Sequence, residues 1–189
     1  DYDWVEVWNG PWRDENQDAL DWWQEQLVSG KRLVAVGGSD VHRPHPYVIH
    51  GMPTTWVYSK SLTSSEILQS INKGHVVLSY SPNGPFIGLT CGTSMTGDLC
   101  EEMEQTDLCE EMEQTVQLNI KDVQYSDVVK VISNHGIEQE VMVGEGQDML
   151  NLSWSAGNRS FYRVEVWRYF PEAKSRLLAA LCNPIYFSK

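Results

Sequence analysis

The sequence of 189 residues lacks any apolar run of about eighteen residues, the length that marks a membrane-spanning helix. It also lacks a basic and then apolar leader, so no signal peptide is predicted. The chain does not open with methionine, and at Trp4 it enters an alternating apolar pattern typical of the middle of a sheet. We therefore expect a cut N-terminus, whose exposed strand edges pair with a second copy or with a missing N-terminal half. We expect a cytoplasmic protein and leave a secreted or periplasmic location open.

Basic residues are few, because 14 lysines and arginines stand against 26 aspartates and glutamates, for a net charge of -12. They are scattered along the chain, whereas binding to the phosphates of nucleic acids needs clustered positive side chains. The composition therefore excludes a nucleic-acid partner. Eight of the acidic residues lie in one short insert, so the rest of the chain has an ordinary charge.

Cysteines are also few and lie far apart, at Cys91, Cys100, Cys109 and Cys182. No two of them form the Cys-x-x-Cys pair of a zinc or redox site. The spacing favours free thiols in a reducing compartment.

The first part of the chain has the sequence pattern of an α/β fold. With 41% hydrophobic residues the chain can bury a core. Up to about residue 80, strand-like and helix-like segments alternate, as in a parallel sheet or barrel covered by helices. Asn16 is a candidate N-cap, and Thr63 with Glu66 has the spacing of a capping box. Strands are predicted at residues 4–8, 33–36 and 75–79, and helices at 16–29 and 63–73.

The second part of the chain has the pattern of an all-β fold. After Pro85 the helical period disappears, and segments such as 116–120 and 162–166 alternate between apolar and polar residues. We therefore place a boundary between an α/β domain at residues 1–83 and a β-sandwich-like domain at residues 84–189. Strands are predicted at residues 86–91, 116–123, 128–133, 138–143, 149–154 and 161–167.

An acidic duplicated insert at residues 98–115 interrupts this second part. The nine residues 98–106 (DLCEEMEQT) return unchanged as residues 107–115. This unit is shorter than the roughly 20 residues of a repeat fold. Each copy carries four carboxylates and no basic residue, which predicts a solvated segment. A recent duplication or an artefact of sequence construction explains it better than a calcium site, because the EF-hand pattern is missing.

Asp40 and His42 are the first candidates for a chemical role. They stand two residues apart, directly after the apolar segment 33–36 and the pair Gly37-Gly38. If the extended backbone continues, both side chains point to the same side. A carboxylate and an imidazole together suit Zn, Mn and Fe, which lower the pKa of bound water enough to supply hydroxide. Their position after a buried strand is where α/β sheets and barrels place their sites.

Several sequence blocks resemble the PHP (polymerase and histidinol phosphatase) superfamily, and most of all its carbaryl-hydrolase-like CehA/McbA branch. The blocks occur in the same order along most of the chain. They are residues 5–10 (VEVWNG), 35–42 (AVGGSDVH), 51–58 (GMPTTWVY), 74–85, 163–166 and 183–186.

The resemblance implies the C-terminal part of a distorted (β/α)7 barrel at residues 1–83, with a site for up to three divalent metals (Mn, Fe or Zn). It implies hydrolysis of a small-molecule phosphoester, ester or carbamate. The family's last ligand motif, Asp-x-His, matches Asp40 and His42, and Asp40 also orients the nucleophile. The family's earlier His-x-His motif has no counterpart here and would lie upstream of Asp1. This chain alone is therefore expected to bind metal weakly and to be inactive.

Four further residues are candidates for lining the site. Glu6 lies within the first predicted strand and points either into the site or to solvent. Asn9, at the end of that strand, either reaches the substrate or caps the following loop, and the cap is favoured. His45 and His50 lie in the loop after His42, where they either contact substrate or are ordinary surface histidines.

The leading hypothesis is therefore a PHP-type metal-dependent hydrolase with Asp40 and His42 as ligands. The rival is a non-catalytic β-sandwich module for binding or interaction, attached to a degenerate PHP remnant. Eight tryptophans suggest a carbohydrate platform on such a module. Trp4, Trp23 and Trp167 fall on apolar periods, however, so core packing accounts better for most of them.

Overall fold

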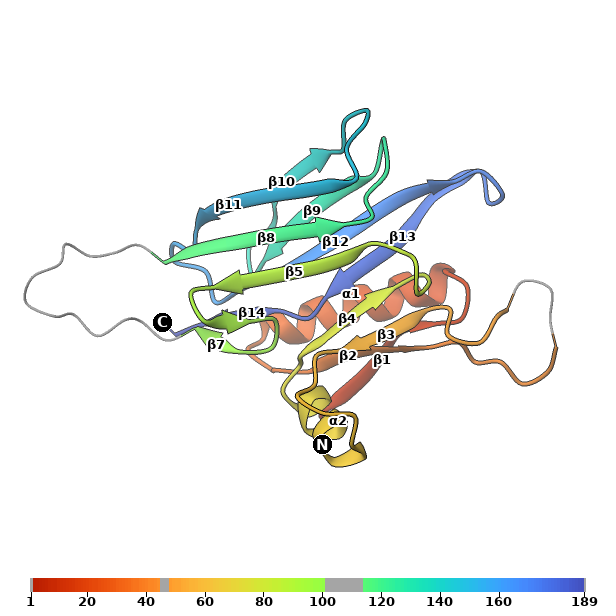
Figure 1. The fold of residues 1–189 in the computed structure, drawn as a ribbon. Helices are drawn as coiled ribbons and strands as arrows, with labels where there is room; N and C mark the ends of the chain where they lie inside the picture. Colours follow the sequence, from red (N-terminus) through yellow and green to blue (C-terminus); the bar gives the residue numbers. More distant parts are fainter. Residues whose placement is uncertain (1, 45–47, 101–113, 189) are drawn as a thin grey trace, which may run out of the picture.

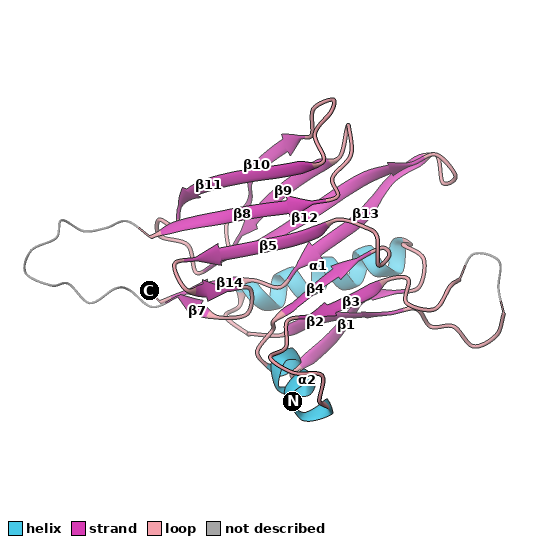
Figure 2. Ribbon diagram, in the orientation of Figure 1, coloured by secondary structure: helices cyan, strands magenta, loops and turns pink. Residues whose placement is uncertain are grey.

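The protein is described here by a computed structural model of residues 2–44, 48–100 and 114–188, which contain two helices and fourteen strands (Figure 1). Strands predominate, and most of them belong to two antiparallel sheets (Figure 2). One face of the larger sheet packs on the smaller sheet, and its other face packs on a helix and a parallel strand pair. Neither helix of these residues combines the length and the apolar character needed to cross a bilayer.

The N-terminal segment forms a parallel β-α-β unit. Strand β1 (Trp4–Asn9) pairs in parallel with β2 (Val34–Gly38), and helix α1 (Asp14–Val28) connects them. The two strands and the helix confirm the predictions for this segment, although the helix begins at Asp14. Asn16 is therefore inside the helix and not at its N-cap. The helix buries one face against the strands and the larger sheet, through Asn16, Leu20, Trp23 and Leu27.

The larger sheet has eight strands, and its main path runs β10-β9-β12-β13-β4-β3 with every neighbouring pair antiparallel. Two short strands, β14 (Ile185–Phe187) and β7 (Leu99–Cys100), extend it beside β12. The strands of the path are β3 (Thr54–Val57), β4 (Val76–Ser79), β9 (Val128–Ser133), β10 (Gly136–Met142), β12 (Phe161–Phe170) and β13 (Ser175–Cys182).

The smaller sheet has four antiparallel strands in the order β11-β8-β5-β6. Its inner residues and those of the larger sheet form one apolar core, in which Leu118, Ile120 and Val164 are almost fully buried. The β-sandwich predicted for the second half of the chain is therefore present. The strands of this sheet are β5 (Phe86–Cys91), β6 (Ser94–Met95), β8 (Thr115–Lys121) and β11 (Met149–Ser155).

Strand β12 is buried on both faces, and its α1-facing side carries an ion pair. Arg163 Nη1 donates to Glu165 Oε1 at 2.5 Å, and both side chains are at most 5% exposed. The Nε of Arg163 donates to Gln24 Oε1 of α1 at 2.7 Å, and Trp167 Nε1 donates to Glu165 Oε2 at 2.7 Å. Because each charge has polar partners, the helix docks on the sheet without an unpaired buried charge. Trp23 lies in this core as predicted.

The expected C-terminal part of a (β/α)7 barrel is not found in the described residues, where antiparallel sheets take its place. The reason lies in the connection between β3 and β4. Helix α2 (Ser64–Asn72) stands at the end of these strands (Figure 1), and Tyr58 N donates to His75 O at 3.0 Å. The chain therefore enters β4 at the end where it left β3, which makes the pair antiparallel. Alternating strands and helices predicted a parallel crossover that this connection does not make.

The boundary predicted near residues 81–85 lies between β4 of the larger sheet and β5 of the smaller sheet, but the larger sheet contains strands from both sides of it. Strand β4, from the first part, pairs with β13, from the second. The division into two domains stays a prediction.

The cysteines of the described residues, Cys91, Cys100 and Cys182, are free and buried, and Cys109 lies outside the described residues. Burial is the main cause that raises the pKa of Cys91, and also that of Cys182, to about 12. These two thiols are therefore protonated at neutral pH and act as small apolar side chains.

Side chains, rather than a strand ladder, attach the parallel pair to the larger sheet. Asn183 is 1% exposed, and its Oδ1 accepts a hydrogen bond from Ala35 N of β2 at 2.7 Å. Its Nδ2 donates to Ala35 O at 2.9 Å and to Val76 O of β4 at 3.1 Å. Further along β2, Thr55 Oγ1 accepts from Gly37 N at 3.1 Å and donates to Gly37 O at 2.7 Å. The free edge of β2 thus finds its partners in two side chains of the other sheet.

Replacing Asn183 by alanine should lower the free energy of unfolding by about 3 kcal/mol. The change leaves the buried N–H and C=O of Ala35 without hydrogen-bond partners and removes the Nδ2 donor to Val76 O. Urea denaturation measures this change. Asn151→Ala is the matched control, since this exposed amide on β11 is expected to contribute less than about 0.5 kcal/mol. Equal losses for the two variants would contradict the role assigned to Asn183.

Candidate functional site

The candidate site lies where the two parallel strands end. The last residues of β1 and β2, Asn9 and Gly38, pair with each other, and the chain then leads directly into Asp40 and His42. His42 Nε2 lies 2.7 Å from Asp40 Oδ1. The two side chains are 81% and 48% exposed, respectively. The structure therefore brings the two predicted ligands into contact at a surface that solvent and ligands can reach.

Asp40 and His42 meet in an irregular segment after β2 and not in an extended strand as expected. Strand β2 ends at Gly38, and Asp40 has a φ of 49°, in the left-handed region that aspartate enters more readily than most residues. The left-handed backbone at Asp40 therefore accompanies the contact between the two side chains.

The two glycines before Asp40 provide space for the neighbouring strand. A Cβ at Gly38 would lie 2.6 Å from Glu6 Oε1, and a Cβ at Gly37 would lie 3.1 Å from Trp8 O. Neither glycine has a positive φ, so the backbone conformation does not itself require glycine at these two positions. Their lack of side chains lets β1 and the carboxylate of Glu6 approach β2.

Glu6 and Asn9 form a second polar pair at this end of the strands. Asn9 Nδ2 donates to Glu6 Oε2 at 3.0 Å, and Glu6 is exposed. The backbone N–H of Asn9 donates to Asn16 Oδ1 at 3.0 Å, and Asn16 Nδ2 donates to Asn9 O at 3.2 Å. The buried amide of Asn16 thus forms hydrogen bonds with the backbone at the outer edge of β1, just as Asn183 does at the outer edge of β2. These two bonds hold the end of β1 at Asn9. The sequence did not reveal this role, because Asn16 had the features of a helix N-cap.

Of the two loop histidines, the structure describes His50 alone. His45 lies outside the described residues. His50 is exposed in the loop before β3, and no contact within the described residues joins it to Asp40 or His42.

Asp40 and His42 offer one oxygen and one nitrogen donor, the combination that suits Zn, Mn or Fe. In residues 2–44, 48–100 and 114–188, no three His, Cys, Asp or Glu side chains come together to share an ion. The pair therefore fits such a metal in donor chemistry but supplies fewer than the roughly three protein ligands that catalytic sites use.

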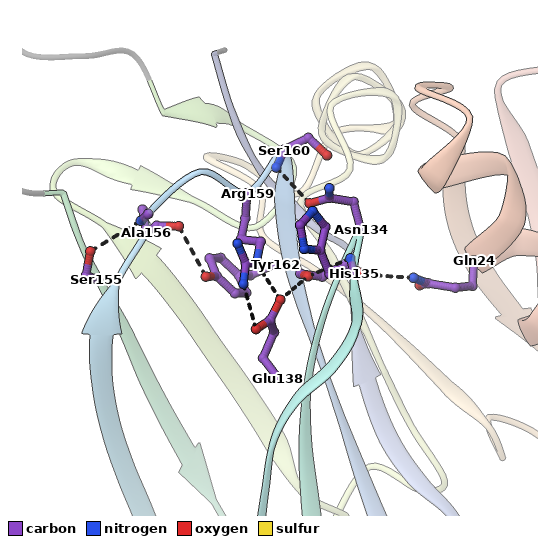
Figure 3. A network of polar contacts seen from close by, with 11 residues as sticks. Gln24, Asn134, His135, Glu138, Ser155, Ala156, Arg159, Ser160 and Tyr162 are labelled. Atoms are coloured by element: carbon purple, nitrogen blue, oxygen red, sulfur yellow. Dashed lines mark hydrogen bonds and ion pairs between the residues drawn. The ribbon is translucent and has the colours of Figure 1, made fainter.

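A separate polar network joins the β9-β10 hairpin to the loop before β12 (Figure 3). Glu138 accepts hydrogen bonds from Arg159 Nε at 2.5 Å and Nη2 at 3.1 Å, and from Ser133 Oγ at 2.5 Å. Asn134 Oδ1 accepts from Ser160 N at 2.9 Å. The hydrogen bond from Arg159 is the main cause that lowers the pKa of Glu138. These side chains have mutual partners, which indicates a structural role.

The surface also has two hollows that lie away from Asp40 and His42. One, of about 390 Å³, lies on the outer face of β5, β8 and β11. The other, of about 360 Å³, lies beside Val34 at the start of β2, and Arg32, Lys73 and Asp98 are among its lining residues. Asp98 is engaged within the protein, because His75 Nε2 lies 2.8 Å from its Oδ1.

Comparison of the chain with protein-family models, with curated proteins and with solved structures gave no match. The assignment of a function therefore depends on the residues and geometry of the chain itself.

The Glu138–Arg159 pair predicts a specific dependence of stability on pH. Because the folded state lowers the pKa of Glu138 below its ordinary value of 4.5, its contribution is present above that pH. It is lost as the pH falls through the lowered pKa. The thermal midpoint of the wild type should therefore fall more steeply below about pH 4.5 than that of Glu138→Gln. Glu140→Gln, an exposed neighbour on β10, should keep the wild-type slope. A Glu138→Gln profile parallel to the wild type would refute the assignment.

Proposed function

We propose that the protein acts in a metal-dependent hydrolase, with Asp40 and His42 as two ligands of a divalent Mn, Fe or Zn ion. The observation that carries this proposal is the 2.7 Å approach of His42 Nε2 to Asp40 Oδ1 beyond the carboxyl end of a parallel strand pair. Sites of α/β proteins lie at this end of their strands, because the loops that follow can present side chains there.

The resemblance of residues 35–42 and the neighbouring blocks to the PHP superfamily supports the same proposal. The barrel plays no part in it. One β-α-β unit and the left-handed backbone at Asp40 are sufficient to place the two side chains together.

The proposed reaction is hydrolysis of a phosphoester, or of another ester or a carbamate. A bound ion of this kind lowers the pKa of coordinated water and so supplies hydroxide near neutral pH. Asp40 and His42 hold the ion, and Asp40 also orients the nucleophile. Asn9 holds the carboxylate of Glu6 at the same end of the strands. Since two ligands are too few, the proposal requires a partner chain that supplies the others.

A second candidate function is that of a binding module, in which the ligand binds to the β-sandwich and not to the parallel β-α-β unit. The observation that favours it is the hollow of about 390 Å³ on the outer face of the smaller sheet. This candidate needs no metal.

The metal proposal is tested by titrating the intact chain with Mn²⁺ and with Zn²⁺ in a calorimeter. We expect weak binding by the wild type and at least about tenfold weaker binding by Asp40→Ala and by His42→Ala, since each change removes a ligand. His50→Ala is the matched control, because it removes an exposed histidine that does not contact the pair. The same affinity in all four proteins would reject Asp40 and His42 as ligands.

A further inference from the structure

The outer face of the smaller sheet is almost free of charge. Its strands β5, β8 and β11 lie side by side (Figure 1), and their outward residues alternate with the buried ones. Among these outward residues, Lys121 is the one with a charged side chain, in a protein with 40 charged residues. The complete outward set is Phe86, Gly88, Thr90, Thr115, Gln117, Asn119, Lys121, Met149, Asn151, Ser153 and Ser155.

A groove crosses the middle of this face, and a glycine opens it. Strand pairing places Gly88 beside Asn119, and Asn119 beside Asn151. A Cβ at Gly88 would meet only the Asn119 carbonyl oxygen, at 3.5 Å, which is an ordinary contact. The missing side chain therefore leaves open space, and it forms part of the hollow of about 390 Å³.

The groove presents neutral hydrogen-bonding groups in two adjacent rows. In the first row Asn119 Nδ2 donates to Asn151 Oδ1 at 2.6 Å, which leaves the Asn119 side-chain oxygen and the Asn151 side-chain NH2 group to bond a ligand. The second row contains Thr90, Gln117 and Ser153, which strand pairing also sets side by side. Within the described part of the chain, the Thr90 and Ser153 hydroxyls make no hydrogen bond. Amides and hydroxyls of this kind both donate and accept, as a sugar hydroxyl does.

An aromatic pair lies next to the groove, at the Phe86 end of β5. Phe86 is the next outward residue from Gly88 on β5, about 7 Å along the strand. It is 40% exposed and packs edge to face against Trp56, which is 38% exposed, with ring centroids 5.8 Å apart. Exposed rings beside hydrogen-bonding groups match a ligand that has both apolar C–H faces and hydroxyl edges.

We propose that this face binds a neutral, unbranched oligosaccharide across β5, β8 and β11. The near absence of charge disfavours an anionic or cationic ligand, and the polar rows disfavour an apolar one. This proposal rests on the second candidate function, the binding module, and names the class of ligand that the module binds. It is independent of Asp40 and His42, which line neither this groove nor its aromatic end.

The test uses calorimetric titration of the full chain with cellohexaose, xylohexaose, mannohexaose and laminarihexaose, and with hexagalacturonate as the charged comparison. We expect binding of at least one neutral hexasaccharide and no binding of hexagalacturonate. Asn119→Ala should weaken binding about tenfold, because it removes hydrogen bonds to the ligand. Gly88→Val should abolish binding by filling the groove. Its folding is checked by the thermal midpoint, which should stay equal or rise, since valine suits a strand better than glycine.

Two controls make the result specific. Gln139→Ala changes an exposed neutral residue on β10, and Asp40→Ala changes the metal candidate, and both should bind the sugar as the wild type does. Loss of binding in Asp40→Ala would refute the independence of the two sites. The proposal is overturned if the wild type binds no neutral hexasaccharide or prefers hexagalacturonate, or if Gly88→Val binds normally. It is also overturned if sedimentation shows a wild-type dimer that Gly88→Val dissociates, because a second copy then covers the face.

Discussion

The buried amide of Asn183 holds the two parts of the molecule together. Its side chain makes three hydrogen bonds, two with the backbone of Ala35 in β2 and one with the backbone of Val76 in β4, so it replaces a strand that the parallel pair does not have. The position of β2 in turn fixes β1, through their ladder, and α1, through the core. Asn16 likewise bonds the backbone N–H and C=O of Asn9 on the outer edge of β1. The side chains of Asn183, Asn16 and Thr55 therefore position the end of the strands that leads into Asp40.

Local patterns predicted elements well and their pairing less well. Strands β5 and β9 have the predicted bounds, because one buried face imposes a period of two, and Thr63 caps α2 through Glu66 N at 3.4 Å. Strand β13 was missed because its Leu and Ala residues are buried on both faces, which removes the period. The prediction of a barrel was wrong because the sequence shows which segments form strands but not where α2 lies relative to them. A helix at the end of a strand pair and a helix across a sheet have the same local sequence features.

The sequence predicted that Asp40 and His42 lie together but not the geometry of their contact, and their role as metal ligands stays a prediction. The position of Asp40 and His42 after an apolar strand was enough to predict that they lie together, and their contact agrees with that. Their approach through a left-handed residue, and the bond of Asn9 to Glu6 across the irregularity in β1, depend on local backbone geometry that no spacing rule contains. The neutral sheet face had a readable pattern, the absence of charge at every second position. Only the pairing of β5, β8 and β11 shows that these uncharged residues form adjacent rows on one face.

Amide hydrogen exchange of Ala35 tests most directly whether the Asn183 side chain holds the parallel unit on the larger sheet. The Ala35 N–H donates to that side chain and to no strand. The account predicts that it exchanges as slowly as the amides of β12 in the wild type. In Asn183→Ala it should exchange much faster, while the amides of β8 and β11 keep their wild-type protection. Fast exchange of Ala35 in the wild type, or an equal loss of protection throughout the protein, would contradict the account.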